Sequence, residues 1–193
     1  MPRTREFCPD DALDKAMHVF WAKGYFGTSI EDLVSATGVS RYGLYGEFGD
    51  KHGLFLAALE RYQSHVIKPI LDIVQQPDAS LTALRSLFET IASAGRDSNE
   101  RLGCLMFNAV SELGQHGDLV STRVGEFRER VAAGLRQMLR NAVAKGELPP
   151  GFDVEREADF LFGILHALPV MARSGIATSA IDNVVGVALD TLR

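Results

Sequence analysis

Apolar residues recur at helical spacing through almost the whole chain, and no segment alternates as a half-buried strand would. After Pro9, for example, Leu13, Met17, Phe20 and Trp21 occupy positions i, i+4, i+7 and i+8, which lie on one face of a helix. Comparable stripes continue to the C-terminal end. The pattern predicts an all-α fold of about nine helices, joined by the short connections typical of bundles.

Composition limits the classes of protein that the chain can represent. At 193 residues and 46% hydrophobic, it can bury a substantial core, in one domain or two small ones. No apolar run is long enough to span a bilayer, and the charged start does not resemble a signal peptide, so we expect a cytoplasmic protein without a membrane segment. Cys8 and Cys104 are far apart and the five histidines are scattered, so we expect reduced thiols, no metal and no cofactor.

Helix-start signals divide the first part of the chain. Thr28, with Glu31 three residues later, predicts a capping box, and Asp50 is the expected cap of a long periodic helix. We expect a small N-terminal domain over residues 1–50 and a larger bundle over residues 51–193, with the boundary within the helix that follows Asp50, so that the two share this helix.

The stretch between these two caps, "TGVSRYGLYGEFGDK", predicts a weak helix. Over residues 41–48, Leu44 and Phe48 fall on one side, which we expect to pack on the preceding helices. Gly43 and Gly46 fall on the opposite side, and each costs roughly 1 kcal/mol relative to alanine inside a helix.

Two bare glycines beside Tyr42, Arg41 and Tyr45 favour a surface that another molecule approaches closely. A short second helix of a helix-turn-helix, inserted into the DNA major groove, fits this description. The alternative is close helix packing at the glycines, with Tyr42 and Tyr45 as core aromatics.

The segment "GYFGTSIEDLVSATGVSRYGLYGEFGDKHGLF", Gly24 to Phe55, resembles the DNA-binding domain of the tetracycline-repressor (TetR) family of bacterial transcriptional regulators. The matching elements are Gly24-Tyr25, Thr28-Ser29, Gly38-Val39-Ser40, Leu44-Tyr45, Phe48 and Lys51. A second segment, "GCLMFNAVSEL", Gly103 to Leu113, is similar to one found in a broad subgroup. The resemblance implies an N-terminal three-helix DNA-binding domain and a C-terminal ligand-binding and dimerisation bundle. It also implies a homodimer, usually a repressor, that binds a partly palindromic operator and is released by a small-molecule effector.

The resemblance also assigns residues to DNA. Family phosphate contacts fall on Ser29, Tyr45 and Lys51, and the positions that face base edges are Ser40, Arg41 and Tyr42. Arg41 is best suited to guanine. Two further positions depart from the family pattern. Gly43, which we place among the DNA-facing residues, stands where many relatives have a larger side chain, and Glu47 stands where many have histidine.

The charge of the chain is unusual for a DNA-binding protein. The net charge is −5, and residues 1–51 carry six basic and eight acidic side chains, a net charge of −2. We therefore expect modest nonspecific binding and a shallow salt dependence. Arg3 and Arg5 fit either an arm in the minor groove or a frayed terminus.

Candidate effector-pocket residues are the larger side chains of the middle helices and one thiol: Phe88, Cys104, Phe107, Phe127, Phe162 and His166. Cys104 is expected in the first turn of a helix, where the helix dipole stabilises a thiolate, so it fits an oxidation or electrophile switch. The alternative is a small buried hydrophobic side chain. His166 fits an effector contact, a dimer contact or a satisfied core histidine.

The last two helical stripes, around Phe160 to Ala172 and Ile181 to Leu192, are too apolar to pack on one side only. The resemblance implies an intersubunit four-helix bundle there, with Pro169 expected to kink the first helix and the two recognition helices roughly 34 to 36 Å apart. The rival interpretation is a helical ligand-binding protein or enzyme with a degenerate head. No nucleophile elbow, phosphate loop or positioned carboxylate pair supports an enzyme.

Overall fold

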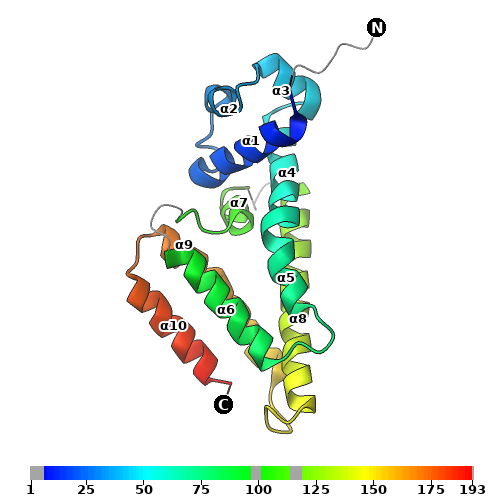
Figure 1. Ribbon diagram of the computed structural model, residues 1–193, viewed down its shortest axis with the longest axis vertical. Helices are drawn as coiled ribbons and strands as arrows, with labels where there is room; N and C mark the ends of the chain where they lie inside the picture. The colour runs from blue at the N-terminus through cyan, green and yellow to red at the C-terminus, as the bar shows by residue number, and fades with distance from the viewer. Residues whose placement is uncertain (1–6, 97–100, 114–118, 193) are drawn as a thin grey trace. The chain divides into compact units, whose positions relative to one another are not determined.

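The computed structural model describes residues 7–96, 101–113 and 119–192, and in these residues it contains helices and no strand. Figure 1 shows their course. The helices are α1 (Pro9–Lys23), α2 (Ile30–Thr37), α3 (Arg41–Phe48), α4 (Lys51–Tyr62), the π-helical segment η1 (Gln63–Ile67), α5 (Lys68–Val74), α6 (Leu81–Arg96), α7 (Leu105–Leu113), α8 (Leu119–Ala144), α9 (Val154–Arg173) and α10 (Thr178–Asp190). Because α4, η1 and α5 follow one another without a break, the described part has nine helical runs, and the all-α prediction is confirmed.

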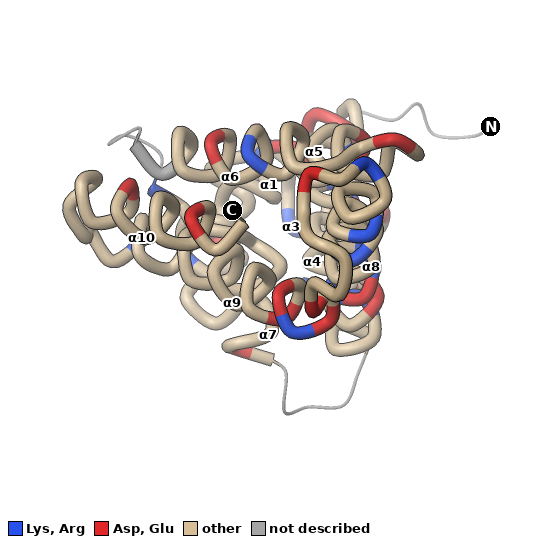
Figure 2. Tube along the Cα trace, turned by 90° about the horizontal axis from the view of Figure 1, so that it is seen from below, with Lys and Arg blue, Asp and Glu red and all other residues tan. Residues whose placement is uncertain are grey.

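The helices differ in their charge. Most of the longer ones carry side chains of both signs, whereas α10 contains Asp182 and Asp190 as its charged residues and neither Lys nor Arg (Figure 2).

Within the described ranges, no helix combines the length and the apolar character that crossing a membrane requires.

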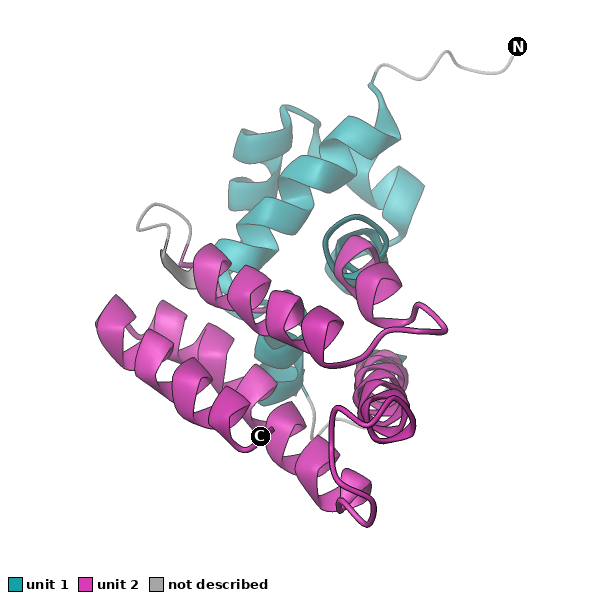
Figure 3. Cartoon of the chain, turned by 60° about the horizontal axis from the view of Figure 1, so that its bottom comes forward, with its two compact units in different colours: residues 1–67, 105–122 teal, residues 68–104, 123–193 magenta. Residues whose placement is uncertain are grey.

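The chain divides into two compact units (Figure 3). Unit 1 consists of residues 1–67 and 105–122, and unit 2 consists of residues 68–104 and 123–193. Helix α7 therefore belongs to the same unit as α1 to α4, although some forty residues of sequence separate it from them. The boundary expected within the helix that follows Asp50 stays a prediction.

The core of unit 1 forms where α1 packs against α2 and α4. Phe20 of α1 and Phe55 of α4 are almost fully buried, and their rings meet edge to face with centroids 5.0 Å apart. Leu33 of α2 and Leu44 of α3 have no exposed surface. Burying a Leu or Phe side chain contributes roughly 1.5–3 kcal/mol, so these contacts hold helices that are too short to be stable alone.

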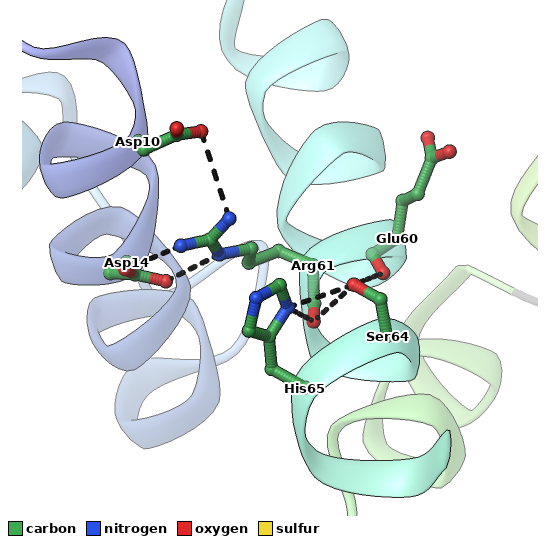
Figure 4. A network of polar contacts seen from close by, with 6 residues as sticks. All are labelled: Asp10, Asp14, Glu60, Arg61, Ser64 and His65. Carbon is green, nitrogen blue, oxygen red and sulfur yellow. Dashed lines mark hydrogen bonds and ion pairs between the residues drawn. The ribbon is translucent and has the colours of Figure 1, made fainter.

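A polar network also joins α1 to α4, as Figure 4 shows. Arg61 donates two hydrogen bonds to the Asp14 carboxylate, from Nε at 2.7 Å and from Nη2 at 2.8 Å, and its Nη1 lies 3.6 Å from Asp10. The hydrogen bond from Arg61 holds the pKa of Asp14 below its usual value of 3.8. The paired carboxylate is therefore charged at neutral pH and fixes the two helices against each other.

The start of α2 corrects one expectation. Its capping box is formed by Ser29 and Asp32, not by Thr28 and Glu31. The Ser29 hydroxyl accepts the N–H of Asp32 at 3.0 Å, and the Asp32 carboxylate accepts the N–H of Ser29 at 2.9 Å. Thr28 is buried instead, and its hydroxyl donates to the carbonyl of Gly24 at 2.6 Å. The Asp50 cap of α4 is confirmed, since its carboxylate accepts the N–H of Gly53 at 2.7 Å.

In unit 2, helix α6 packs against α9 and α10, and α9 packs against α10. The inward residues of α9 and α10 are buried leucines, isoleucine, valine and alanines: Ala158, Leu161, Leu165, Leu168, Ala172, Ile181, Val185, Ala188 and Leu189. Pro169 lies inside α9, which continues to Arg173. Glu147 accepts hydrogen bonds from the Ser80 hydroxyl and the Leu81 N–H, and so joins the start of α6 to the segment that follows α8.

Candidate nucleic-acid interface

The turn between α2 and α3 is closed by Thr37, a residue that no sequence motif indicated. Its buried hydroxyl donates to the carbonyl of Leu33 at 2.7 Å and accepts the N–H of Val39 at 3.1 Å. Gly38 ends α2 in the left-handed conformation, with φ +73°, where other residues are strained. The local sequence therefore fixes the direction in which α3 leaves α2.

Helix α3 is held from behind, as its sequence predicts. The Ser40 hydroxyl caps it by accepting the N–H of Gly43 at 3.2 Å. Leu44 is fully buried, Val39 is buried and Phe48 is half-buried. These contacts supply the stability that an eight-residue helix with two glycines lacks.

The opposite side of α3 is open to solvent. Tyr42 is 82% exposed, Arg41, Gly46 and Glu47 are also exposed, and Tyr45 is half-buried. Arg41, Tyr42, Tyr45 and Gly46 together line a shallow hollow in the surface. The alternative in which Tyr42 is a core aromatic is therefore wrong.

The two glycines of α3 have different surroundings. A Cβ added at Gly46 would meet nothing within 4 Å, so the expected bare backbone is present there. A Cβ at Gly43 would lie 2.8 Å from Cγ1 of Val39 and 3.4 Å from the Phe7 ring. The expectation that both glycines are bare is therefore wrong for Gly43, where the missing side chain permits close packing inside unit 1.

Both cations expected at DNA lie over a tyrosine ring. The Arg41 guanidinium carbon is 5.2 Å from the centroid of the Tyr45 ring, and the Lys51 ammonium is 4.5 Å from the centroid of the Tyr25 ring. These distances are within the range of cation–π attraction, about 6 Å. Lys51 is also the first residue of α4, where the N-terminal N–H groups of the helix favour an anion.

The two serines expected at the interface are exposed, and both act as helix caps. The Ser29 hydroxyl donates to the Asp32 carboxylate at 2.9 Å, so it must leave that partner before it donates to a phosphate. The hydrogen bond from Lys23 and those from Ser29 lower the pKa of Asp32 to about 2. Lys23 partly neutralises this acidic group beside the proposed phosphate contact.

The candidate effector residues do not all lie in one unit. Phe88 and Phe127 are buried in unit 2, whereas Phe107 is buried in unit 1. Cys104 is buried and directly precedes the first residue of α7. Phe162 and His166 are half-buried on α9 of unit 2. Arg3 and Arg5 lie outside the described residues.

Two family models match the chain. The model described as "Bacterial regulatory proteins, tetR family" matches residues 12–58, which include α2, α3 and their turn. The model described as "Tetracyclin repressor-like, C-terminal domain" matches residues 80–185, which is more than half of the chain.

Individual relatives agree with the family models. The HTH-type transcriptional repressor ComR of Escherichia coli (strain K12) is 36% identical over 97% of this chain and 90% of its own length. The HTH-type transcriptional regulator YezE of Bacillus subtilis (strain 168) is 29% identical over 77% of this chain and 76% of its own. A solved structure of the TetR-family regulator CifR, a cysteine mutant in complex with 26-base-pair operator DNA, is 28% identical. It superimposes with a TM-score of 0.84 and covers 97% of this chain and 98% of its own. The chain therefore belongs to the TetR family of DNA-binding transcriptional regulators.

Proposed function

We propose that the chain is a repressor that binds a two-fold operator as a homodimer, with one α3 in the major groove of each half-site. The observation that carries this proposal is the open front of α3, where the 82% exposed Tyr42 and the exposed Arg41 flank the bare backbone of Gly46. Exposed polar and aromatic side chains beside a stretch of bare backbone suit contact with base edges. Domains over residues 1–50 and 51–193 would then divide DNA binding from effector binding and dimerisation.

The contacts that we propose fall into two groups. Ser40, Arg41 and Tyr42 face the bases. Gly43, which the sequence also placed there, packs against Val39 and Phe7 and is left out of the proposed contacts. Ser29, Tyr45 and Lys51 hold the phosphates, and Lys51 does so with both its charge and the N-terminus of α4.

Dimerisation through α9 and α10 is supported by apolar side chains on their outer surfaces. Phe160, Val170 and Val187 are 41%, 50% and 65% exposed, although the inward faces of the same helices are already buried. Gly163 and Gly186 are exposed as well, and a Cβ at either would meet nothing within 4 Å. Exposed apolar side chains with small residues beside them are suited to burial against a second copy.

The effector pocket is proposed inside unit 2, from the side chains of Phe88, Phe127, Phe162 and His166. The half-buried positions of Phe162 and His166 on α9 support this choice, because an effector there would contact a helix of the proposed dimer interface. The remaining candidates are Phe107, within α7, and Cys104, directly before it. Modification of Cys104 is the thiol-reactive alternative. Full alkylation of Cys104 without any change in operator binding would exclude that alternative.

The family also supports two further parts of the proposal. The protein acts by binding DNA rather than by catalysing a reaction, and it works in the cytoplasm, where the bacterial chromosome is. The name of ComR as a transcriptional repressor supports repression as the outcome.

Selection of bound sequences from random DNA with the purified full chain tests the proposal. We expect enrichment of a two-fold site whose half-sites are about one helical turn apart, or a multiple of that spacing. A parallel selection without protein controls for amplification bias. Absence of an enriched two-fold site would overturn the proposal and favour a helical ligand-binding protein or enzyme with a degenerate head.

A further inference from the structure

Helix α3 carries its arginine and a partner for that arginine one helical turn apart. Arg41 and Tyr45 are four residues apart, so their side chains lie on the same face of the helix. The guanidinium carbon stands 5.2 Å from the centroid of the Tyr45 ring, and both side chains line the hollow on the open surface of α3. The ring thus holds the guanidinium at the surface that we propose for base contact.

The benefit of such an arrangement is largest for an acidic DNA-binding region. Residues 1–51 have a net charge of −2, so long-range attraction to the phosphates is weak. A free arginine loses the rotamer freedom of a long side chain when it is fixed on a base. A ring that already restricts the guanidinium lowers this cost before DNA arrives.

Lys51 shows the same arrangement in a second place. Its ammonium lies 4.5 Å from the centroid of the Tyr25 ring. Tyr25 in turn packs against Phe55, with ring centroids 5.0 Å apart, and stacks with Phe20 at 6.4 Å. A ring fixed by the core of unit 1 is a rigid support, so the two cations that we assign to DNA are both placed by tyrosines.

We propose that Tyr45 is a specificity-positioning residue, whose ring orients the Arg41 guanidinium toward one guanine in each half-site. The inference rests on the proposed function. It differs from the phosphate contact already assigned to Tyr45, because that contact needs the hydroxyl, whereas the positioning role needs only the ring. Phenylalanine therefore separates the two roles, and leucine removes both.

The test measures binding of the full chain to its selected operator and to operators with single base-pair substitutions. The base pair that Arg41 reads is identified as the position at which Arg41→Ala no longer distinguishes the selected base pair from its substitutions. At that base pair, Tyr45→Leu is expected to reduce discrimination roughly two- to fivefold per half-site, while Tyr45→Phe keeps it and weakens binding to all operators equally. Circular dichroism verifies that each variant is folded. Because the Tyr45 side chain is only half-buried, we expect its replacement to leave the fold intact.

A double-mutant cycle shows whether Tyr45 acts through Arg41. In an Arg41→Ala background, Tyr45→Leu is expected to cause no further loss of discrimination at that base pair. Equal effects of Tyr45→Leu and Tyr45→Phe, or a specificity loss that persists without Arg41, would overturn the inference but leave the operator intact. An Arg41→Ala variant with unchanged discrimination at every base pair would also overturn it. Failure of the unmodified chain to select any operator would overturn the proposed function and this inference together.

Discussion

The backbone N–H of Phe26 donates a hydrogen bond of 3.0 Å to Oε2 of Glu112, which joins the turn after α1 to helix α7. A Cβ added at Gly24 would lie 2.1 Å from Oε1 of the same carboxylate, so the glycine leaves the space that Glu112 occupies. Gly24 also has φ +75°, a conformation that favours glycine. This contact is a reason that α7 belongs to unit 1 with the DNA-binding helices.

Removal of that carboxylate should loosen the turn. Glu112→Ala leaves the Phe26 N–H without this acceptor, and we expect a loss of about 1 kcal/mol in the free energy of unfolding. Glu112→Gln retains an acceptor oxygen and should lose less. Urea denaturation gives the stabilities, and hydrogen exchange of the Phe26 amide should be faster in Glu112→Ala. Identical exchange rates in all three proteins would show that the hydrogen bond does not hold the turn.

The two glycines of α3 should respond in opposite directions to alanine. Gly46→Ala enters open space and gains roughly 1 kcal/mol of helix propensity. Gly43→Ala places a methyl group against the buried Val39, and overpacking of this kind costs roughly 1–3 kcal/mol. Gly43→Ala should therefore be the less stable variant in urea denaturation. Gly46→Ala should nevertheless bind operator more weakly, because its new side chain faces the proposed DNA surface. A Gly43→Ala variant that is more stable than Gly46→Ala would contradict the close packing of Gly43 against Val39.

The Asp14–Arg61 pair should make stability depend on acidic pH. Because the pKa of Asp14 is lowered in the folded state, its contribution is fully present above the usual value of 3.8 and disappears as pH falls through the lower folded value. Asp14→Asn should lose less than about 1 kcal/mol of unfolding free energy at neutral pH, since solvent screens part of the attraction between the two charges. Urea denaturation from pH 6 to pH 2.5 should show the wild-type and variant curves converge at the acidic end. If the difference in stability between the wild type and the variant stays constant over this range, the Asp14–Arg61 pair is not the cause of that difference.

Charge on the outer surface of α10 should separate the subunits. Val187 is 65% exposed in the single chain, so Val187→Glu should not disturb folding, but it would bury a carboxylate in the proposed dimer interface. Sedimentation analysis should give a monomer. Ile73→Glu, an equivalent change at a 49% exposed residue of α5, is the matched control and should remain dimeric. A dimer of unchanged stability in Val187→Glu would place the interface elsewhere.

The helices and the packing of the inner side of α3 could be predicted from the sequence, because periodic apolar residues and caps act over a few residues. The cap of α2 was predicted one residue early. Thr28 and Ser29 each precede an acidic residue by three positions, and only the burial of Thr28 decides between them.

Contacts distant in sequence could not be predicted. A helical projection places Gly43 on the outer side of α3, but Phe7, from the segment before α1, packs against it together with Val39 of the preceding turn. The Glu112 contact joins residues 86 positions apart, and no local pattern indicates it. The Arg41–Tyr45 pair is different, since its spacing of four residues within a helix was visible in the sequence.

The affinity of Arg41→Ala for the selected operator tests most directly whether the open surface of α3 binds DNA. Loss of an arginine that contacts guanine costs roughly 1–3 kcal/mol per half-site, and the homodimer loses this contact in both half-sites, so we expect binding to weaken at least about thirtyfold with the fold intact. Lys68→Ala removes the same charge from an exposed position on α5 and should bind like the unmodified chain. An Arg41→Ala protein that binds the operator as tightly as Lys68→Ala would contradict the account.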